Sequence, residues 1–147
     1  MPKYTFYIVG LISLLLSCQT DKAPSLAPEY LYDAKDQQMI SSSISSRNGT
    51  ISLLYGNDEV LSNKRYSKGA NYTLVTWKQK PMPGWYGTNM NSAIYSVETM
   101  SVQSGANHQL NIRYQFKTGP SFPIENTIPS AKQRINFILA QPKAVRP

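Results

Sequence analysis

Apolar and polar side chains alternate with a period of two along several stretches of this chain, which is the pattern of a β-strand that buries one face. The clearest stretch is residues 71–79, and the same pattern predicts strands over residues 50–55, 92–102 and 108–116. In the clearest stretch, Tyr72, Leu74 and Thr76 share one face, and Thr73, Val75 and Trp77 share the other. Residues 103–107 include a glycine and predict a hairpin connection between the last two strands.

A period of 3.6 residues predicts a helix near the C-terminus, over residues 130–141. Its buried stripe is formed by Ile135, Ile138 and Leu139, and Phe137 lies beside the stripe. Ser130 and Gln133 have the spacing of a capping box, and Pro142 ends the helix.

Two further helices follow from weaker patterns. Residues 30–40 begin with helix-compatible residues and predict a helix, whereas the serine-rich residues 41–49 predict a loop. Residues 59–66 predict a short helix with Asn57 or Asp58 as its N-cap. The fold class predicted from these patterns is α+β: mainly an antiparallel β-sheet with flanking helices, including a C-terminal helix.

The residues around the single cysteine, Cys18, resemble the signal sequence of a bacterial lipoprotein. Lys3 supplies a positive charge, and the apolar run over residues 4–16 is shorter than the about 20 residues that a transmembrane helix needs. The sequence "LLSC" then resembles a lipobox. We expect residues 1–17 to be a signal peptide, residues 18–28 a lipidated cysteine with a flexible tether, and residues 29–147 a single domain.

A lipoprotein signal predicts a location in the cell envelope, where the protein is anchored in a membrane by acyl chains such as palmitate on Cys18. Gln19 follows the cysteine, which in enteric bacteria resembles the pattern of an outer-membrane lipoprotein facing the periplasm or the surface. The alternative is an ordinary cleaved signal peptide with an incidental cysteine.

The net charge of the chain adds little to the prediction of an anchored envelope protein. The chain has 15 Lys and Arg residues against 8 Asp and Glu residues, a formal net charge of +7. The basic residues are scattered singly or in pairs, which is typical of a solvated basic surface. An envelope location and the lack of a nucleic-acid-binding motif argue against nucleic acid as a partner.

The sequence offers few groups for catalysis. Its one histidine, His108, lies at a predicted strand start, and the chain has no G-x-S-x-G, Walker or G-x-G-x-x-G motif. A metal site of the Cys/His type is excluded by the number of these residues. Glu98 lies on a predicted strand, where we expect it on the exposed face. An enzyme is therefore the less favoured class, and no residue is assigned a catalytic role.

Aromatic side chains around the loop "KPMPGWYG" are the best candidates for ligand binding. Trp85 and Tyr86 lie in this loop and Trp77 precedes it; with His108 they could contact a sugar, a base or a porphyrin. The alternative is that Trp77 belongs to the core, and that Trp85 and Tyr86 hold the loop against the sheet.

Three blocks of the chain together resemble the cytochrome P-460 domain family. They are "GTISLLYGNDEV" (residues 49–60), "KGANYTLVTWKQKPMPGWYGTNMNSAIYSVETM" (residues 68–100) and "RINFILAQPKAV" (residues 134–145). The resemblance implies a small antiparallel β-domain with helices. It also implies, for the haem-bearing members, a c-type haem on a C-x-x-C-H motif, a further covalent link to the porphyrin, and oxidation or binding of small nitrogen compounds.

This chain departs from that family because it has no C-x-x-C-H motif, so covalent c-type haem attachment is not expected. Three functions remain open. The first is a non-catalytic, lipid-anchored protein that binds a small apolar or aromatic ligand or another envelope protein. The second is a redox or sensor protein with non-covalent haem, held by His108 or Tyr86. The third is a module that recognises glycans or surfaces through Trp85 and Tyr86.

Overall fold

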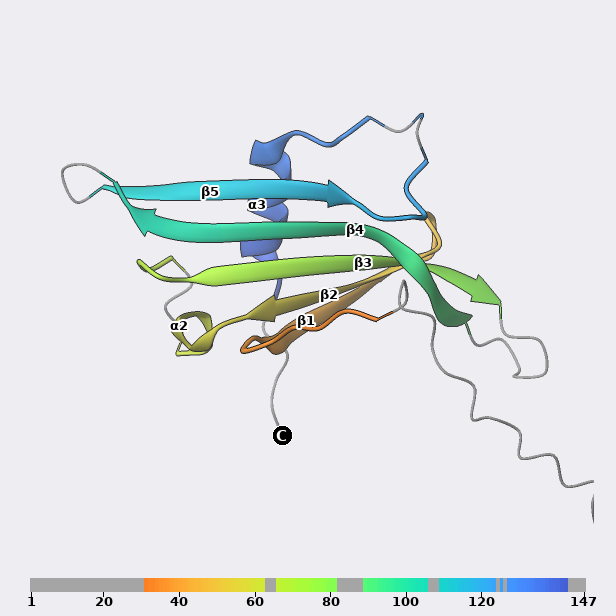
Figure 1. Cartoon of the computed structure of the whole chain (residues 1–147), viewed down its shortest axis with the longest axis horizontal. Coiled ribbons are helices and arrows are strands. Elements are labelled where there is room, and N and C mark those ends of the chain that lie inside the picture. The colour runs from red at the N-terminus through yellow and green to blue at the C-terminus, as the bar shows by residue number, and fades with distance from the viewer. Residues whose placement is uncertain are drawn as a thin grey trace, which may run out of the picture.

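A computed structural model describes residues 31–62, 66–81, 89–105, 109–123, 125 and 127–142. Its centre is one antiparallel sheet in which each strand pairs with the next strand along the chain, in the order β1-β2-β3-β4-β5 (Figure 1). The strands and the two helices are β1 (Gln38–Ser45), β2 (Thr50–Gly56), α2 (Asp58–Leu61), β3 (Asn71–Pro81), β4 (Asn89–Ser104), β5 (Leu110–Thr118) and α3 (Ala131–Ala140). The prediction of a mainly antiparallel sheet with a C-terminal helix is confirmed.

Helix α3 packs across one face of the sheet, behind the strands in the view of Figure 1. Its buried residue Ile138 belongs to an apolar core with side chains from β1, β2, β3 and β4, and α2 adds Val60. Ile135 and Leu139 pack against this core, so the predicted apolar stripe of the helix is confirmed. The buried core residues are Ile40, Leu54, Val60, Ala70, Tyr72, Leu74, Met100, Val102 and Ile138.

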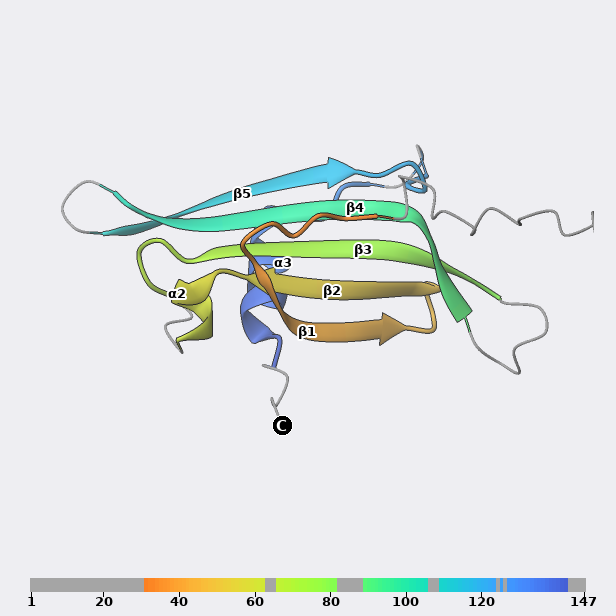
Figure 2. The same ribbon diagram turned by 60° about the horizontal axis from the view of Figure 1, so that its bottom comes forward.

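The opposite face of the sheet is crossed by the N-terminal segment, residues 31–37 (Figure 2). On this segment the ring of Tyr32 lies 5.7 Å from the ring of Tyr55 on β2. Val75 and Trp77 on the central strand β3 are buried as well. Because β3 is central and buried over most of its length on both faces, its alternation separates two buried surfaces rather than a core from solvent.

Strand β4 contains two irregularities next to β3. Thr76 pairs with Ser96 and Trp77 with Ile94, so Tyr95 is an extra residue in β4; a second register shift lies between Trp77 and Gln79. A bulge bends its strand and re-aims a side chain. The first part of β4 bends relative to the rest of the strand in Figure 1. Tyr95 and Ser96 both face the side where α3 lies, since they border the same cavity as residues of that helix.

The predicted helix over residues 30–40 is wrong: β1 begins at Gln38, and residues before it form an irregular segment with a turn. Lys35 has a positive φ of 51°, and its backbone N–H donates to Oδ1 of Asp33, a local turn that competes with a helix. Leu31 and Met39, apolar residues near the two ends of the predicted helix, are each 53% exposed.

The predicted serine-rich loop is also mostly wrong, because residues 41–45 belong to strand β1. Their pairing with β2 satisfies the backbone, and the β1–β2 turn is restricted to residues 46–49, where Gly49 has a positive φ of 57°. The serine-rich composition shows that the segment is polar, but it does not reveal that these residues form a strand.

The short helix α2 begins after Asn57, the predicted N-cap position, but Asn57 does not cap it with its side chain. Its amide instead donates to the carbonyl of Gly69 and accepts from the backbone N–H of Asn71, which ties the helix to the start of β3. Ser130 occupies the N-cap position of α3, again without a side-chain capping bond. Within the described residues, neither helix is long and apolar enough to cross a membrane.

Candidate functional site

A pocket of about 660 Å³ lies on the α3 side of the sheet, at the end where β4 bulges. The sheet forms its floor, α3 forms one wall, and the connection after β5 forms another. We call this cavity the polar pocket. Its described lining residues are Ser43, Ile44, Ser45, Arg47, Asn48, Thr50, Ser52, Thr76, Lys78, Tyr95, Ser96, Glu98, Phe116, Phe122, Thr127, Pro129, Arg134 and Phe137.

The floor of the polar pocket is rich in hydroxyl groups on neighbouring strands. Thr50, Thr76 and Ser96 are buried, and the hydroxyls of Ser52 and Thr76 lie 2.8 Å apart in a hydrogen bond. These residues share their sheet face with the apolar core. The same face is therefore apolar where the end of α3 covers it and polar where the pocket lies. Hydroxyl groups can donate and accept, so this floor can contact a polar ligand.

A buried ion pair closes the floor beneath α3. Glu98 on β4 is 1% exposed and accepts two hydrogen bonds from Arg134 on α3, from Nε to Oε2 at 2.8 Å and from Nη2 to Oε1 at 2.7 Å. The hydroxyl of Tyr114 on β5 donates to Oε2 at 2.7 Å. Bidentate, charge-assisted contacts of this kind hold two groups in a fixed geometry. They fix α3 to the sheet.

The ionisation of this cluster follows from its contacts. Burial raises the pKa of the Tyr114 hydroxyl, and its hydrogen bond to the Glu98 carboxylate raises it further. Burial acts to lower the pKa of Arg134, but the hydrogen bonds to Glu98 outweigh it and raise that pKa. At neutral pH the guanidinium is therefore charged and the phenol keeps its proton.

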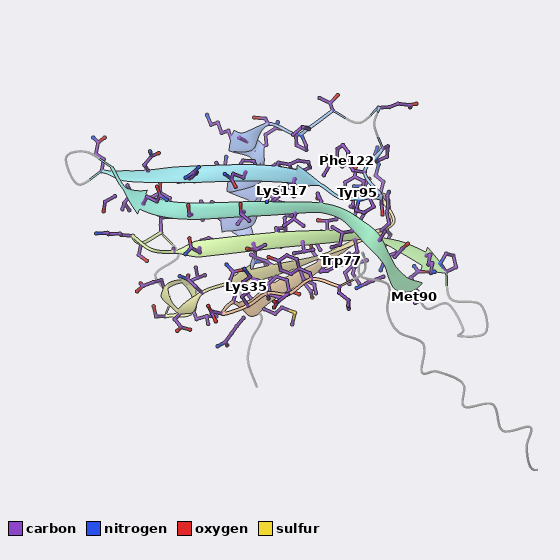
Figure 3. The ribbon with its side chains drawn as sticks, viewed as in Figure 1. Lys35, Trp77, Met90, Tyr95, Lys117 and Phe122 are labelled. Carbon is purple, nitrogen blue, oxygen red and sulfur yellow. The ribbon has the colours of Figure 1, made fainter. Side chains whose placement is uncertain are left out.

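An aromatic wall stands beside the hydroxyl floor. The Tyr95 and Phe122 rings have centroids 4.9 Å apart, and the Phe116 ring is 5.7 Å from that of Phe122 (Figure 3). Tilted and edge-on contacts at such distances are the favoured ones between aromatic rings. The wall thus joins β4, β5 and the connection after β5.

Backbone contacts hold this connection against the bulged part of β4. The N–H of Gly119 donates to the carbonyl of Tyr95, and the N–H of Ser121 donates to the carbonyl of Ile94. The hydroxyl of Ser121 also donates to the carbonyl of Ala93. A Cβ at position 119 would collide with the Ile94 carbonyl, so this close approach requires glycine.

Positive charge dominates the lining. Arg47, Lys78 and Arg134 face a single carboxylate among the described lining residues, Glu98, and Arg134 already pairs with it. Lys78 donates to the carbonyl of Asn48 at 2.9 Å, and its Nζ lies 5.1 Å from the centre of the Tyr95 ring. An ammonium group has three N–H donors, so Lys78 can also donate to a ligand. The pocket is suited to an anionic ligand.

The site residues expected from the sequence are placed differently. Trp77 is 3% exposed and does not line the polar pocket; its neighbours Thr76 and Lys78 do, so its side chain is on the other face of β3. Figure 3 shows it over the sheet, apart from Tyr95 and Phe122. Cys18, Trp85, Tyr86 and His108 lie outside the described residues. A joint ligand site of these aromatic residues and His108 stays a prediction.

Most residues of the polar pocket were not singled out from the sequence. The expectation that Glu98 lies on the exposed face of its strand is wrong, because it is buried under α3. The alternation along the strand indicated the buried position. Glu98, Met100 and Val102 are two residues apart and share one face, and Met100 and Val102 belong to the core. No sequence pattern places Arg134 or Phe122 next to it.

The lining of the polar pocket does not fit a haem. The usual protein ligands of haem iron are His, Cys and Met, with Tyr in some proteins, and the described lining has no His, Cys or Met. Tyr95 is its one candidate, and it is engaged with Phe122 and Lys78. The described part of the chain also has no group of three His, Cys, Asp or Glu residues that could hold a metal ion.

No known family model matches the chain, and a comparison with curated protein sequences finds no significant match. The resemblance to the cytochrome P-460 domain family stays a prediction.

Proposed function

We propose that this chain is a lipid-anchored protein of the cell envelope that binds a small ligand in the polar pocket without catalysing a reaction. The observation that carries the proposal is the pocket itself. Its volume is within the range of about 300–1,000 Å³ of small-molecule sites. It combines polar groups that can fix a ligand's orientation with aromatic side chains that can cover its apolar part.

The non-catalytic part of the proposal rests on how the charged groups are engaged. The carboxylate of Glu98 accepts from both Arg134 and Tyr114, which leaves it as a structural acceptor rather than a base. A general base must reach the proton that it removes, and both oxygens of this carboxylate already accept hydrogen bonds from the protein.

The sequence around Cys18 supports a membrane anchor, and we propose the outer membrane as the location. In this setting the P-460 resemblance accounts for a fold and not for an activity, since the chain lacks the C-x-x-C-H motif. A protein partner from the envelope is the alternative to a small ligand.

The ligand can be sought directly. The full chain, a Ser43→Trp variant and a Lys117→Glu variant are purified from the same cells, and small molecules released on denaturation are compared by mass spectrometry. Ser43 lines the pocket, whereas Lys117 on β5 is exposed and pairs with Val97, outside the pocket lining. We expect a compound in near-stoichiometric amount with the wild type and Lys117→Glu, and its loss with Ser43→Trp. Equal extracts from all three proteins would contradict the proposal.

Haem binding is tested separately by an absorption spectrum of the chain during titration with haemin. We expect no Soret band of defined stoichiometry. A stoichiometric band that is lost in His108→Ala would replace the proposed function with that of a non-covalent haem protein.

A further inference from the structure

Exposed apolar side chains border the cationic lining of the polar pocket. Phe137 on α3 is 36% exposed and lines the pocket. Ile128 is 56% exposed and lies between two lining residues, Thr127 and Pro129. A single exposed apolar residue is ordinary, but here the helix and the connection before it each present one beside the pocket.

Further into the pocket the lining is polar and positive. Lys78 is half-buried and lines the pocket together with buried hydroxyls, whereas Arg47 lines it as an exposed residue. The carboxylate of Glu98 is already paired with Arg134. Apart from Arg47, the order from solvent inward is therefore apolar, then cationic and hydroxyl-bearing. A ligand that matches it has an anionic head and an apolar tail, with the head pointing inward.

We infer that the polar pocket takes the phosphate-bearing headgroup of an anionic phospholipid from the membrane in which the chain is anchored. This inference rests on the proposed function. The acyl chains leave over Ile128 and Phe137 and stay in the bilayer, because a whole diacyl lipid is larger than a cavity of about 660 Å³. Processing at Cys18 removes one basic residue, Lys3, and the positive net charge that remains favours a negatively charged membrane surface.

The length of the N-terminal tether allows this contact. The described residues begin at Leu31, and the segment from Cys18 to that point can extend by about 45 Å at most. An acylated Cys18 thus keeps the domain within reach of the bilayer, where anionic headgroups are concentrated.

The test uses the full chain, processed as in the cell and reconstituted in nanodiscs. One set of discs contains only phosphatidylcholine, and the other contains about one fifth phosphatidylglycerol. The anchor keeps the protein on the disc in both, so membrane recruitment is not the readout. The readout is amide hydrogen exchange in residues 119–123 and 127–137, measured by mass spectrometry.

We expect exchange in these segments to slow by about fivefold with phosphatidylglycerol, because a ligand that binds the native pocket suppresses its opening. Lys78→Gln abolishes the slowing and Lys78→Arg keeps it. Lys117→Gln, which removes the same charge outside the pocket, keeps it as well. Ile128→Ser weakens it, whereas Leu110→Ser, at an exposed apolar residue outside the lining, does not.

Equal exchange in the two kinds of disc, or equal loss in Lys78→Gln and Lys117→Gln, overturns the inference. A third arm adds glycerol phosphate to phosphatidylcholine discs. If glycerol phosphate slows exchange in a Lys78-dependent way and phosphatidylglycerol does not, the lipid assignment is wrong and the small-ligand function remains. The Ser43→Trp comparison above decides that function independently.

Discussion

Glu98 is the residue whose environment differs most from what its chemistry favours. A carboxylate that is 1% exposed is costly to bury, and its two bonds from Arg134 and one from Tyr114 compensate this cost. In the described part of the chain, no buried side-chain nitrogen or oxygen lacks a partner. The hydrogen bonds of this cluster form only when β4, β5 and α3 come together. The cluster is therefore intact only when the helix is correctly docked.

Removing Arg134 leaves this buried carboxylate without its cation. We predict that Arg134→Met lowers the free energy of unfolding by about 3–5 kcal/mol, measured by urea denaturation at pH 7. Glu98→Leu in the same chain restores part of that loss, because the unpaired charge is then gone. The control is Arg113→Met on β5, which is exposed and changes stability by less than about 0.5 kcal/mol. A loss no larger in Arg134→Met than in this control would show that the ion pair does not hold α3.

Tyr114 predicts an alkaline dependence of stability. Its pKa is raised in the folded chain, so the stabilisation is complete below the unfolded pKa of about 10 and is lost as pH rises toward the folded pKa. We expect wild-type stability to fall above pH of about 10 more steeply than that of Tyr114→Phe, which has no phenol to ionise at this position. Urea unfolding across this pH range gives both slopes. Tyr66→Phe, at an exposed tyrosine, is the control for loss of a phenol. Identical slopes for Tyr114→Phe and the wild type would contradict the assignment.

Among the elements, β4 and the connection after β5 decide where the aromatic wall stands. The bulge at Tyr95 puts this residue and Ser96 on the same side, and Gly119 and Ser121 fasten the connection to the bulged residues. Phe122 is placed beside Tyr95 by these backbone contacts. The wall is thus a consequence of main-chain geometry as much as of side-chain attraction.

Gly119→Ala tests this arrangement. The added Cβ meets the carbonyl of Ile94, so the connection must move, at a cost of about 1–3 kcal/mol. We expect weaker nuclear Overhauser effects between the Tyr95 and Phe122 rings. Gly105→Ala, where the new Cβ would lie 3.2 Å from the carbonyl of Gln109, is the milder control and leaves these signals unchanged. Intact ring contacts in Gly119→Ala would show that the connection is held in another way.

The N-terminal segment contains the described non-glycine residue with a positive φ, Lys35. A left-handed conformation costs a side chain with a Cβ about 1–2 kcal/mol relative to glycine. We predict that Lys35→Gly raises the thermal midpoint and that Lys35→Ala, which has the same charge change but keeps a Cβ, does not. A larger gain from alanine than from glycine would place the strain elsewhere.

At the scale of the whole molecule, the proposed lipid anchor determines where the polar pocket can act. Cys18 is the only cysteine, and the processing expected for it differs from that of an ordinary secreted protein. The pocket and the anchor can serve one function only if the mature chain has both the acylated Cys18 and the folded domain.

Globomycin, which inhibits the lipoprotein signal peptidase, tests the anchor. We predict that cells treated with it accumulate an unprocessed precursor of this chain, and that labelled palmitate is incorporated with and without the inhibitor, because the diacylglyceryl group is attached to the cysteine before cleavage. Cys18→Ala abolishes the label in both conditions. Normal processing in the presence of globomycin would remove the anchor from the proposal, and with it the membrane source of the inferred ligand.

Local sequence pattern was sufficient to predict the strands β2 to β5, the C-terminal helix and the apolar stripe of that helix. Each of these has a local periodicity that assigns its side chains to faces, so it can be recognised without knowing which element packs against it. It did not determine β1, because the serine-rich residues 41–45 form a strand only through pairing with β2. The helix expected over residues 30–40 fails for a related reason: the apolar residues there meet no common surface.

The polar pocket, in contrast, depends on tertiary packing. Glu98 and Arg134 are separated by a strand and a long connection, and only the docking of α3 brings their side chains within 2.7 Å. Tyr95 enters the pocket through a bulge, which exists only relative to the neighbouring strand β3. Periodicity records which face of an element is buried, whereas a site depends on which elements meet, and that follows from packing across the whole chain.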